Sequence, residues 1–333
     1  MVRCIASFSN STPFNQGHLH PSKRMANEKA KPFVKWAGGK AQLLPQFAAH
    51  YPRELAEGKI DAYIEPFIGG GAVFLDVAQR FPIRRAYLYD INEELVLTYQ
   101  VARRAPEKLI SALRRLAHDY AVRDDAARRE LFYEVRTLYN AQRYHFDYHD
   151  IRSDEAALRA ARMIFLNKTC YNGLFRMNRR GDFNVPFGRY KRPAILDEEN
   201  IRRVSDVLQI AEIRSGDFTA CREHLDARAF VYFDPPYRPI SKTSSFTSYS
   251  KYVFDEQEQV RLGRFYADIS ESTSARLMLS NSDPKNSTPD DHFFENLYQQ
   301  FHIYRVSAKR MINSDARKRG EISELVITNY DAA

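Results

Sequence analysis

Residues 62–80 read AYIEPFIGGGAVFLDVAQR, an apolar strand followed by a glycine-rich turn and a helix. The apolar run at 62–67 suits a buried strand, and residues 72–80 have helical spacing. Three successive glycines at 69–71 separate them; without a Cβ they permit a sharp turn and a close approach of the backbone to a ligand. The pattern fits a ligand-binding turn, or a simple tight connection between a strand and a helix.

The same order of strand, turn and helix returns elsewhere in the chain. Residues 85–89 read as a strand that ends at Asp90, and a helical stretch follows at 93–104. Two more strand patterns occur, IRSGDF at 213–218 and FVYF at 230–233. Strands that alternate with helices, with polar residues where the strands end, indicate a doubly wound α/β sheet. Ligands of such sheets bind at the carboxyl ends of the strands.

The rhythm breaks between residues 106 and 200. Helical segments rich in Arg and Glu, at 107–141 and 154–168, lead to TCYNGLFRMNRRGDFNVPFGRYKRP at 169–193, which has little periodicity. We therefore predict three parts: a leader at 1–30, disordered or an upstream start before Met25; a catalytic domain at 31–93 and 201–333; and an inserted domain at 94–200.

Composition limits the class of protein. The formal net charge of +8 favours an anionic partner such as DNA, RNA or a membrane surface. No apolar run is long enough to span a membrane, and the N-terminus lacks the apolar core of a signal peptide. Cys4, Cys170 and Cys221 have no CxxC spacing, and no HExxH motif occurs. We expect neither a metal site nor a disulfide framework, and the cysteine usage fits a reducing cytoplasm.

Two motifs near the glycine turn suggest a nucleoside ligand. The turn lacks the G-x-G-x-x-G pattern and the Gly-Lys-Ser/Thr of a P-loop, which favours a nucleoside without a pyrophosphate. Asp90 at a strand end can accept both ribose hydroxyls, although an Asp there can also cap a helix. Upstream, KWAGGK at 35–40 places Lys40 where it can neutralise a ligand carboxylate; alternatively it forms a basic surface turn with Trp36 in the core.

The strand pattern at 230–233 runs into Asp234-Pro235-Pro236-Tyr237. The prolines fix φ and remove two N–H donors, so the turn holds one shape. The Asp234 carboxylate and the Pro235 carbonyl then present two acceptors, which match an amino group with two N–H donors. Tyr237 offers a flat face on which an aromatic ring can stack. This turn is predicted to clamp the exocyclic amine of an aromatic ring.

In this order, KWAGGK, EPFIGGGAVF, YDIN, GDF and DPPY make the chain resemble the Dam-type DNA adenine-N6 methyltransferases, the alpha group of the D12 class. The resemblance covers residues 31–330, and YNGLFRMNRRGDFNVPFGRYK is close to the family's recognition hairpin. It implies a Rossmann-like S-adenosylmethionine-dependent methyltransferase sheet with an inserted, mainly helical target-recognition domain. It also implies S-adenosylmethionine as methyl donor, no metal, double-stranded DNA as partner, and the bacterial cytoplasm as location.

The resemblance also assigns site residues. The target adenine, flipped out of the duplex, would be held by Asp234, Pro235, Pro236 and Tyr237. Asp234 would contact the cofactor as well. Trp36 and Lys40 would contact its methionine part, and Phe67, Gly69 and Gly71 would line its nucleoside and methionyl portion. Asp90 would bind the ribose, and Asp217 with Phe218 would bind the adenine.

DNA contacts are expected from the insert. Between residues 176 and 192 six Arg and Lys face one acid, Asp182, although a solvated basic surface would look the same. By similarity to the GATC-modifying members, the DNA-binding candidates are Arg176 and Asn178 as base readers, Leu174 and Pro186 against a thymine methyl, Tyr171 as a wedge in the opened stack, and Asn172 and Arg189. GATC is the expected target. The polar loop at 241–252 is expected to close over substrate or to follow phosphates.

The expected chemistry follows from the properties of the exocyclic amino group of adenine. The N6 lone pair of adenine is delocalised into the ring, and two acceptors that hold both N6 hydrogens favour its localisation. It can then attack a sulfonium methyl group in line, with positioning and electrostatics supplying most of the acceleration. The predicted function is methylation of adenine N6 within GATC, as the modification enzyme of a restriction–modification system or, alternatively, as a housekeeping enzyme. A cognate restriction endonuclease would then be a functional rather than a physical partner.

Two alternatives stay open. One is an amino-methyltransferase that acts on cytosine N4 or on RNA adenine. Asp234, where cytosine-N4 enzymes usually carry Ser, and the hairpin, which RNA enzymes lack, count against it. The other is an inactive DNA-binding module of the same fold, against which the intact Asp234 and Tyr237 count.

Overall fold

The structure is a computed structural model that describes residues 28–238, 254–309 and 321–332. Nearly all of the predicted leader and the whole loop at 241–252 lie outside these ranges. The strands are β1 (Ala62–Glu65), β2 (Arg85–Asp90), β3 (Ala211–Ser215), β4 (Ala229–Phe233), β5 (Arg276–Ser282), β6 (His302–Lys309) and β7 (Glu321–Thr328). The helices are α1 (Leu44–Phe47), α2 (Arg53–Ala56), α3 (Ala72–Arg80), α4 (Glu93–Arg104), α5 (Pro106–Ala121), α6 (Asp125–Gln142), α7 (Asp154–Thr169), α8 (Glu198–Val207), α9 (Glu256–Ser272) and α10 (Phe293–Leu297).

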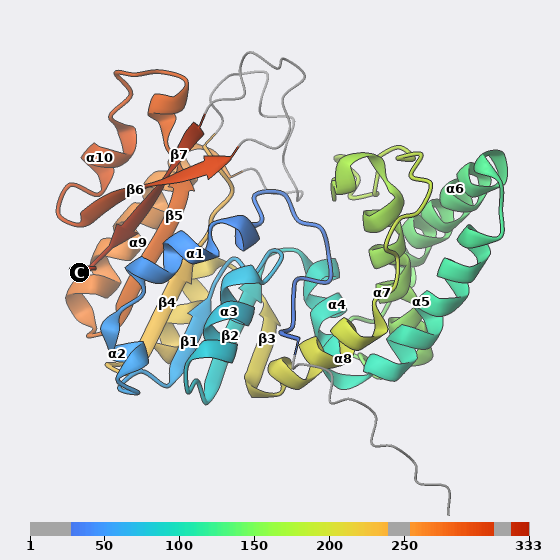
Figure 1. The fold of residues 1–333 in the computed structure, drawn as a ribbon, viewed down its shortest axis with the longest axis horizontal. Helices are drawn as coiled ribbons and strands as arrows, with labels where there is room; N and C mark the ends of the chain where they lie inside the picture. Colours follow the sequence, from blue (N-terminus) through green and yellow to red (C-terminus); the bar gives the residue numbers. More distant parts are fainter. Residues whose placement is uncertain (1–27, 239–253, 310–320, 333) are drawn as a thin grey trace, which may run out of the picture.

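Within the described residues, seven strands form one sheet in the order β3-β2-β1-β4-β5-β7-β6 (Figure 1). The first five of these are parallel, and β7 runs antiparallel to both β5 and β6. Successive connections proceed outward from β1 to β3 and then resume at β4, so the topological switch point lies between β1 and β4. The predicted doubly wound α/β sheet is confirmed, and its ligand site is expected at this switch point.

Side chains alternate along the central strands and build two hydrophobic cores. Tyr63 and Tyr232 point into the core formed with α3, α4 and the helices beyond them. Ile64 and Phe233 point into the opposite core, formed with α9 and α10. Every residue of β1 and β4 is buried, as is usual for central parallel strands covered on both faces.

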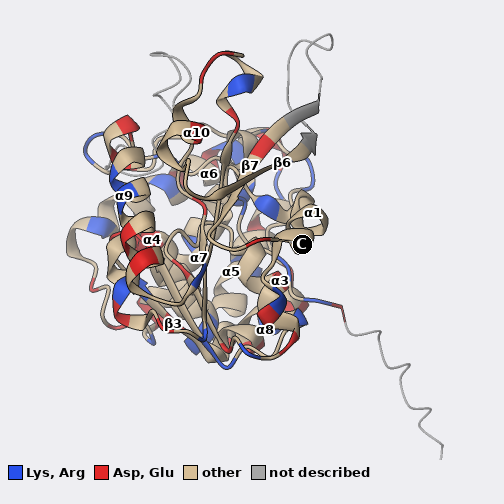
Figure 2. Ribbon diagram, turned by 90° about the vertical axis from the view of Figure 1, so that its left-hand side faces the viewer, with Lys and Arg blue, Asp and Glu red and all other residues tan. Residues whose placement is uncertain are grey.

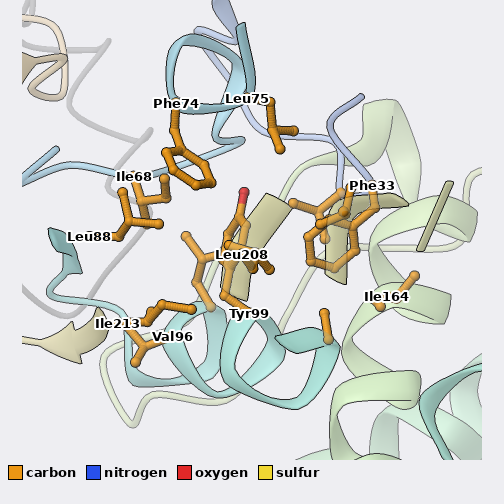
Figure 3. Packing of buried hydrophobic residues seen from close by; sticks show 14 of the residues in the cluster. Phe33, Ile68, Phe74, Leu75, Leu88, Val96, Tyr99, Ile164, Leu208 and Ile213 are labelled. Atoms are coloured by element: carbon orange, nitrogen blue, oxygen red, sulfur yellow. The ribbon is translucent and has the colours of Figure 1, made fainter. Parts of the chain in front are cut away.

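Helix α4 follows β2 and contacts the glycine turn. Its first turn is capped by Asn92, whose side-chain oxygen accepts hydrogen bonds from the backbone N–H of Glu94 at 3.1 Å and of Leu95 at 3.3 Å. The cap is therefore Asn92, not Asp90. Figure 3 shows Tyr99 of α4 projecting into the buried cluster, where its hydroxyl donates to the Gly69 carbonyl at 3.2 Å.

Helices α5, α6 and α7 form a lobe beyond β3 (Figure 1). The helical region predicted at 107–141 is two helices, because Asp124 caps α6 by accepting from the Ala127 N–H at 2.9 Å. Helix α4 packs against β2 and β3 as well as α5 and α7, so its contacts belong to both parts of the molecule. The division of the chain at 93/94 and 200/201 stays a prediction.

Charge is mixed over the surface. Figure 2 shows Lys and Arg interspersed with Asp and Glu along the described elements, so the net charge does not by itself mark a nucleic-acid surface. None of the helices in the described ranges is both long and apolar enough to cross a membrane.

Candidate active site

A cavity of about 870 Å³ opens at the carboxyl ends of β1, β2 and β4. Ligand sites typically have volumes of about 300–1,000 Å³. Every residue predicted for the cofactor or for catalysis lines this cavity: Trp36, Lys40, Phe67, Gly69, Gly71, Asp90, Asp217, Phe218, Asp234, Pro235, Pro236 and Tyr237. The fold thus brings the predicted cofactor and catalytic motifs to one place.

The glycine turn is shaped by its neighbours. Gly69 has φ +46° and Gly71 has φ +68°, in the region that L side chains rarely adopt. A Cβ on Gly69 would lie 2.9 Å from Trp36 Cδ1, and one on Gly71 would lie 2.6 Å from the Tyr99 hydroxyl. Both the backbone conformation and the available space therefore require glycine at these two positions.

Asp90 lies at the end of β2 and is tied to this turn. Its carboxylate accepts hydrogen bonds from the backbone N–H of Gly69 at 3.2 Å and of Asn92 at 2.9 Å. Burial raises the pKa of Asp90 to about 6, and these backbone hydrogen bonds oppose the rise. At neutral pH the group is ionised, which suits it to accept hydrogen bonds from a ligand's hydroxyls.

The turn at residues 234–237, called the DPPY turn below, forms the second half of the cavity. Asp234 Oδ1 lies 2.6 Å from Lys40 Nζ and accepts a hydrogen bond from Ser280 Oγ at 3.1 Å. Burial raises the pKa of Asp234, while Lys40 and Ser280 oppose the rise. Gln259 of α9 donates to the Pro236 carbonyl at 2.8 Å. This hydrogen bond ties the turn to the helix that covers the opposite face of the sheet from α3 and α4.

Lys40 contacts the DPPY turn directly, through both Asp234 and Tyr237. Its side chain is only 2% exposed. Its ammonium donates to the Tyr237 hydroxyl at 2.9 Å and to the Gly38 carbonyl at 2.8 Å. Burial alone would lower the pKa of Lys40, but Asp234, Tyr237 and the nearby Glu324 raise it above its ordinary value, so the group is charged.

The aromatic wall of the cavity is covered by an arginine. Phe218 lies with its ring centroid 5.6 Å from that of Phe67. The Arg261 guanidinium lies 4.0 Å from the centroid of Phe218, and its two terminal nitrogens bind Asp217 at 3.0 and 2.6 Å. Asp217 also accepts hydrogen bonds from the backbone N–H of Thr219 at 3.0 Å and from its hydroxyl at 2.8 Å, so four donors within the protein already bind this carboxylate.

Several residues of this region were missed by sequence reasoning. Glu65 stands within the glycine motif itself and is fully buried; burial raises its pKa well above the ordinary value. Glu324 interrupts the apolar strand pattern of β7, and an acid in such a strand is the signal that could have identified it. The others come from separate elements and carry no local signal: Tyr232, Phe254, Gln259, Arg261 and Ser280.

The predicted recognition segment forms a hairpin at residues 170–188, called the hairpin below. Isolated bridges pair Cys170 with Phe187 and Met177 with Phe183. Tyr171 is 55% exposed, and Asn172, Pro186 and Arg189 are also exposed, whereas Leu174, Arg176 and Asn178 are half-buried.

Both predicted base readers, Arg176 and Asn178, have hydrogen-bond partners within the hairpin. Arg176 Nε donates to Asn184 Oδ1 at 3.0 Å, which leaves its terminal nitrogens for other acceptors. The side-chain oxygen of Asn178 accepts from the backbone N–H of Arg180 at 2.9 Å and of Asp182 at 3.0 Å. Asn178 therefore stabilises the tip of the hairpin, as Asn commonly does in turns.

Helix α6 supports the hairpin through backbone groups. Asn140 pairs with both backbone groups of Phe183, accepting from its N–H at 2.9 Å and donating to its carbonyl at 3.1 Å. Arg143 donates to the Arg180 carbonyl at 2.7 Å. These contacts hold the hairpin in place without using its side chains.

The hairpin also contacts the cavity wall. Trp36, which lines the cavity, stacks on Phe175 of the hairpin with ring centroids 5.6 Å apart. The buried Asn167 binds both backbone groups of Lys35, each at 2.7 Å, and donates to the Gly173 carbonyl at 3.1 Å. The KWAGGK segment is thus fastened to the hairpin on one side and to the glycine turn on the other.

The described cysteines do not favour thiolate chemistry. Cys170 and Cys221 are buried, and burial raises the pKa of each thiol to about 12. Among the residues that the structure describes, no three His, Cys, Asp or Glu side chains are grouped to hold a metal ion.

Comparison with known proteins agrees with this geometry. The family described as D12 class N6 adenine-specific DNA methyltransferase matches residues 36–312. A type II methyltransferase of Methanocaldococcus jannaschii, M.MjaIII, is 47% identical over 91% of this chain and 100% of its own length. The type II methyltransferase M1.LlaDCHI of Lactococcus lactis is 37% identical over 90% of the chain and 95% of its own.

A third relative, the DNA adenine methylase of Escherichia coli K12, is 32% identical over 90% of this chain and 95% of its own length. The family match extends over most of the chain, and these relatives are similar to it over nearly their full lengths. The chain therefore belongs to the D12 class of N6 adenine-specific DNA methyltransferases, enzymes that methylate adenine in DNA.

Proposed function

We propose that this enzyme methylates the adenine of GATC in duplex DNA, with S-adenosylmethionine and a flipped adenine held in the same cavity. One observation carries the proposed reaction: the DPPY turn, Asp90 and the glycine turn line a single cavity of about 870 Å³. The two-acceptor turn and the ribose-binding carboxylate therefore face one volume, as transfer between two nucleosides requires.

The residues present fit S-adenosylmethionine. Asp90, fixed by two backbone N–H groups, would accept the ribose hydroxyls, and Phe67 with Phe218 would line the adenine. Trp36, against the glycine turn, would pack on the methionine part. When bound, the cofactor supplies a methyl group on a positively charged sulfur.

At the target base, the DPPY turn would act on the amino group. Asp234 and the Pro235 carbonyl would accept the two N6 hydrogens, and Tyr237 would stack on the ring. Within the described residues no group donates a hydrogen bond to the Pro235 carbonyl, while that of Pro236 is taken by Gln259. This difference supports Pro235 as the second acceptor.

DNA recognition is assigned to the hairpin. Arg176 would read a guanine edge through its terminal nitrogens, the commonest specific contact in DNA complexes. Tyr171, which is exposed at the base of the hairpin, would fill the space of the flipped base. The remaining proposed contacts are Asn172, Leu174, Asn178, Pro186 and Arg189; for Asn178 the free amide hydrogen is the available donor.

The biological role we propose is that of a modification enzyme in a restriction–modification system. Two of the relatives are named type II methyltransferases, and the nearer of these shares 47% of its residues over its whole length. The division into a catalytic domain, at 31–93 and 201–333, and an inserted target-recognition domain at 94–200 is part of the same proposal.

The test is to map modified bases in a plasmid recovered from a host that lacks its own adenine methylation and expresses this chain. We expect N6-methyladenine at GATC and at no other tetranucleotide. Methylation of adenine in a different sequence would contradict the proposed target but not the reaction. Methylation of cytosine, or none in an enzyme that is folded, would contradict the reaction as well.

A further inference from the structure

Glu324 is a buried carboxylate that the mechanism above does not use. It lies on β7, opposite Ser282 of β5, and is 9% exposed. Its Oε2 atom lies 3.8 Å from Lys40 Nζ and, within the described residues, accepts no hydrogen bond. An acid with an unfilled acceptor, directed at the lysine that holds Asp234, calls for a chemical explanation because burying such a group is unfavourable.

We propose that Glu324 receives, through Lys40, the proton that adenine N6 loses when it is methylated. This inference rests on the proposed function of the cavity and extends it to the fate of the proton. Glu324 would act only through Lys40 and would not touch the substrate.

The reaction requires such an acceptor. Methyl transfer forms the N6–C bond, breaks the S–C bond and leaves N6 with two hydrogens and a positive charge. N6 then gives one proton to Asp234, its hydrogen-bond acceptor. Asp234 must lose that proton before it can accept an amino hydrogen as a carboxylate in the next cycle.

Lys40 is placed to pass the proton on. Its ammonium can give one proton to Glu324 while it takes one from Asp234, 2.6 Å away on its other side. The net result is an ionised Asp234, an unchanged ammonium and a protonated Glu324. The step needs Lys40 Nζ to approach Glu324 by about 1 Å to reach hydrogen-bond distance, a motion available to a lysine side chain.

The proton affinities on the two sides support this transfer. Burial raises the pKa of both Asp234 and Glu324, and Lys40 lowers both. Both acids are therefore shifted in the same direction by burial and opposed by the same lysine. The groups that face Glu324 are Lys40 from the KWAGGK segment and Asp234 and Tyr237 from the DPPY turn; Asp234 raises the pKa of Glu324, and Lys40 and Tyr237 lower it.

The test compares Glu324→Gln with wild-type enzyme in steady-state, multiple-turnover methylation of a duplex that contains one target site, because the reset of Asp234 limits only the second and later turnovers. Glutamine has the same shape but cannot take the proton. We expect the rate at saturating cofactor and DNA to fall about 10- to 100-fold, while the dissociation constants for S-adenosylhomocysteine and DNA stay unchanged. Glu324→Asp, which keeps an acid, should recover part of the rate.

The pH profile separates proton acceptance from mere positioning. Both Asp234 and Glu324 must be ionised, so the wild-type log rate should fall with a slope of about 2 on acidification, and that of Glu324→Gln with a slope of about 1. Glu54→Gln is the matched control: this half-buried acid pairs with Arg276 outside the cavity and should leave rate and slope unchanged.

A wild-type rate in Glu324→Gln would overturn the inference, and so would a slow variant that keeps the wild-type slope. Failure of the proposed function has a different signature, because the wild-type enzyme itself would then not form N6-methyladenine.

Discussion

At the scale of single residues, Asp90 shows how burial prepares a ligand contact. Two backbone N–H groups hold its carboxylate at the cavity wall, and burial raises its pKa to about 6. The raised value means that Asp90 is ionised above that pH and becomes neutral as the pH falls through it. A neutral carboxyl group is a weaker acceptor for ribose hydroxyls.

We therefore predict that affinity for S-adenosylhomocysteine decreases on acidification from pH 7.5 to pH 5, by up to about tenfold given the ionised fraction that remains. Calorimetric titration at several pH values measures it. Asp90→Asn should bind weakly at every pH and without this dependence. An affinity that stays constant in wild-type enzyme across the range would show that the ionised form of Asp90 is not what the ligand contacts.

At the scale of elements, the hairpin is held by hydrogen bonds to its backbone as well as by buried side chains such as Phe175. Asn140 of α6 binds the backbone of Phe183, and Arg143, the residue that follows α6, binds that of Arg180. Because these contacts use backbone groups of the hairpin, a side chain such as that of Arg176 can be replaced without loss of them. Base recognition by Arg176 and the backbone hydrogen bonds that hold the hairpin would thus use separate groups of the protein.

For this element we predict that Arg176→Ala weakens discrimination at one base pair by about 1–3 kcal/mol. Lys191→Ala is the matched control, since Lys191 is exposed just beyond the hairpin and should weaken all sequences alike if it binds phosphate. Methylation rates on duplexes with single substitutions in the target measure both variants. An equal loss on every duplex in Arg176→Ala would identify Arg176 as a phosphate contact instead.

At the scale of the whole molecule, a buried ion pair ties the helical lobe to the sheet. Glu94, in the first turn of α4, accepts from Arg159 Nε of α7 at 3.0 Å, and the side chains are 3% and 0% exposed. Tyr148 donates to the same carboxylate at 2.5 Å. Because α4 starts beside Asp90, this pair fixes the lobe relative to the cavity.

Removing one partner would leave the other charge buried. We predict that Arg159→Met lowers the free energy of unfolding by about 3–5 kcal/mol, measured by urea denaturation. Arg202→Met, which breaks an exposed pair with Glu107, should leave the free energy of unfolding nearly unchanged, because surface ion pairs stabilise little. Similar losses in the two variants would contradict a structural role for the buried pair.

Local sequence signals predicted much of the fold. Helices were expected at 72–80 and 93–104, the bounds of α3 and α4, because a glycine turn precedes the first and Asn92 caps the second. Strand ends carrying Asp90 and Asp234 were also identified, since an acid that follows an apolar run is visible in the sequence. The break at 122–124 was not, although Asp124 is the residue that makes it.

The candidate site was predictable where its residues lie in contiguous motifs. The predicted cofactor and catalytic residues all line one cavity, while their roles remain proposals. What the motifs did not indicate is the partner of Lys40: its ammonium binds Asp234 and lies near Glu324, a residue 284 positions away that only the sheet topology brings close. Contacts between distant strands have no local pattern.

The central claim is that Asp234 of the DPPY turn acts on the amino group in methyl transfer. Single-turnover transfer of labelled methyl groups to a GATC duplex tests it most directly, with Asp234→Ala compared to wild-type enzyme. The account predicts a loss of at least about 100-fold with the binding of DNA and S-adenosylhomocysteine largely retained. Methylation by Asp234→Ala at a rate near that of the wild-type enzyme would contradict it.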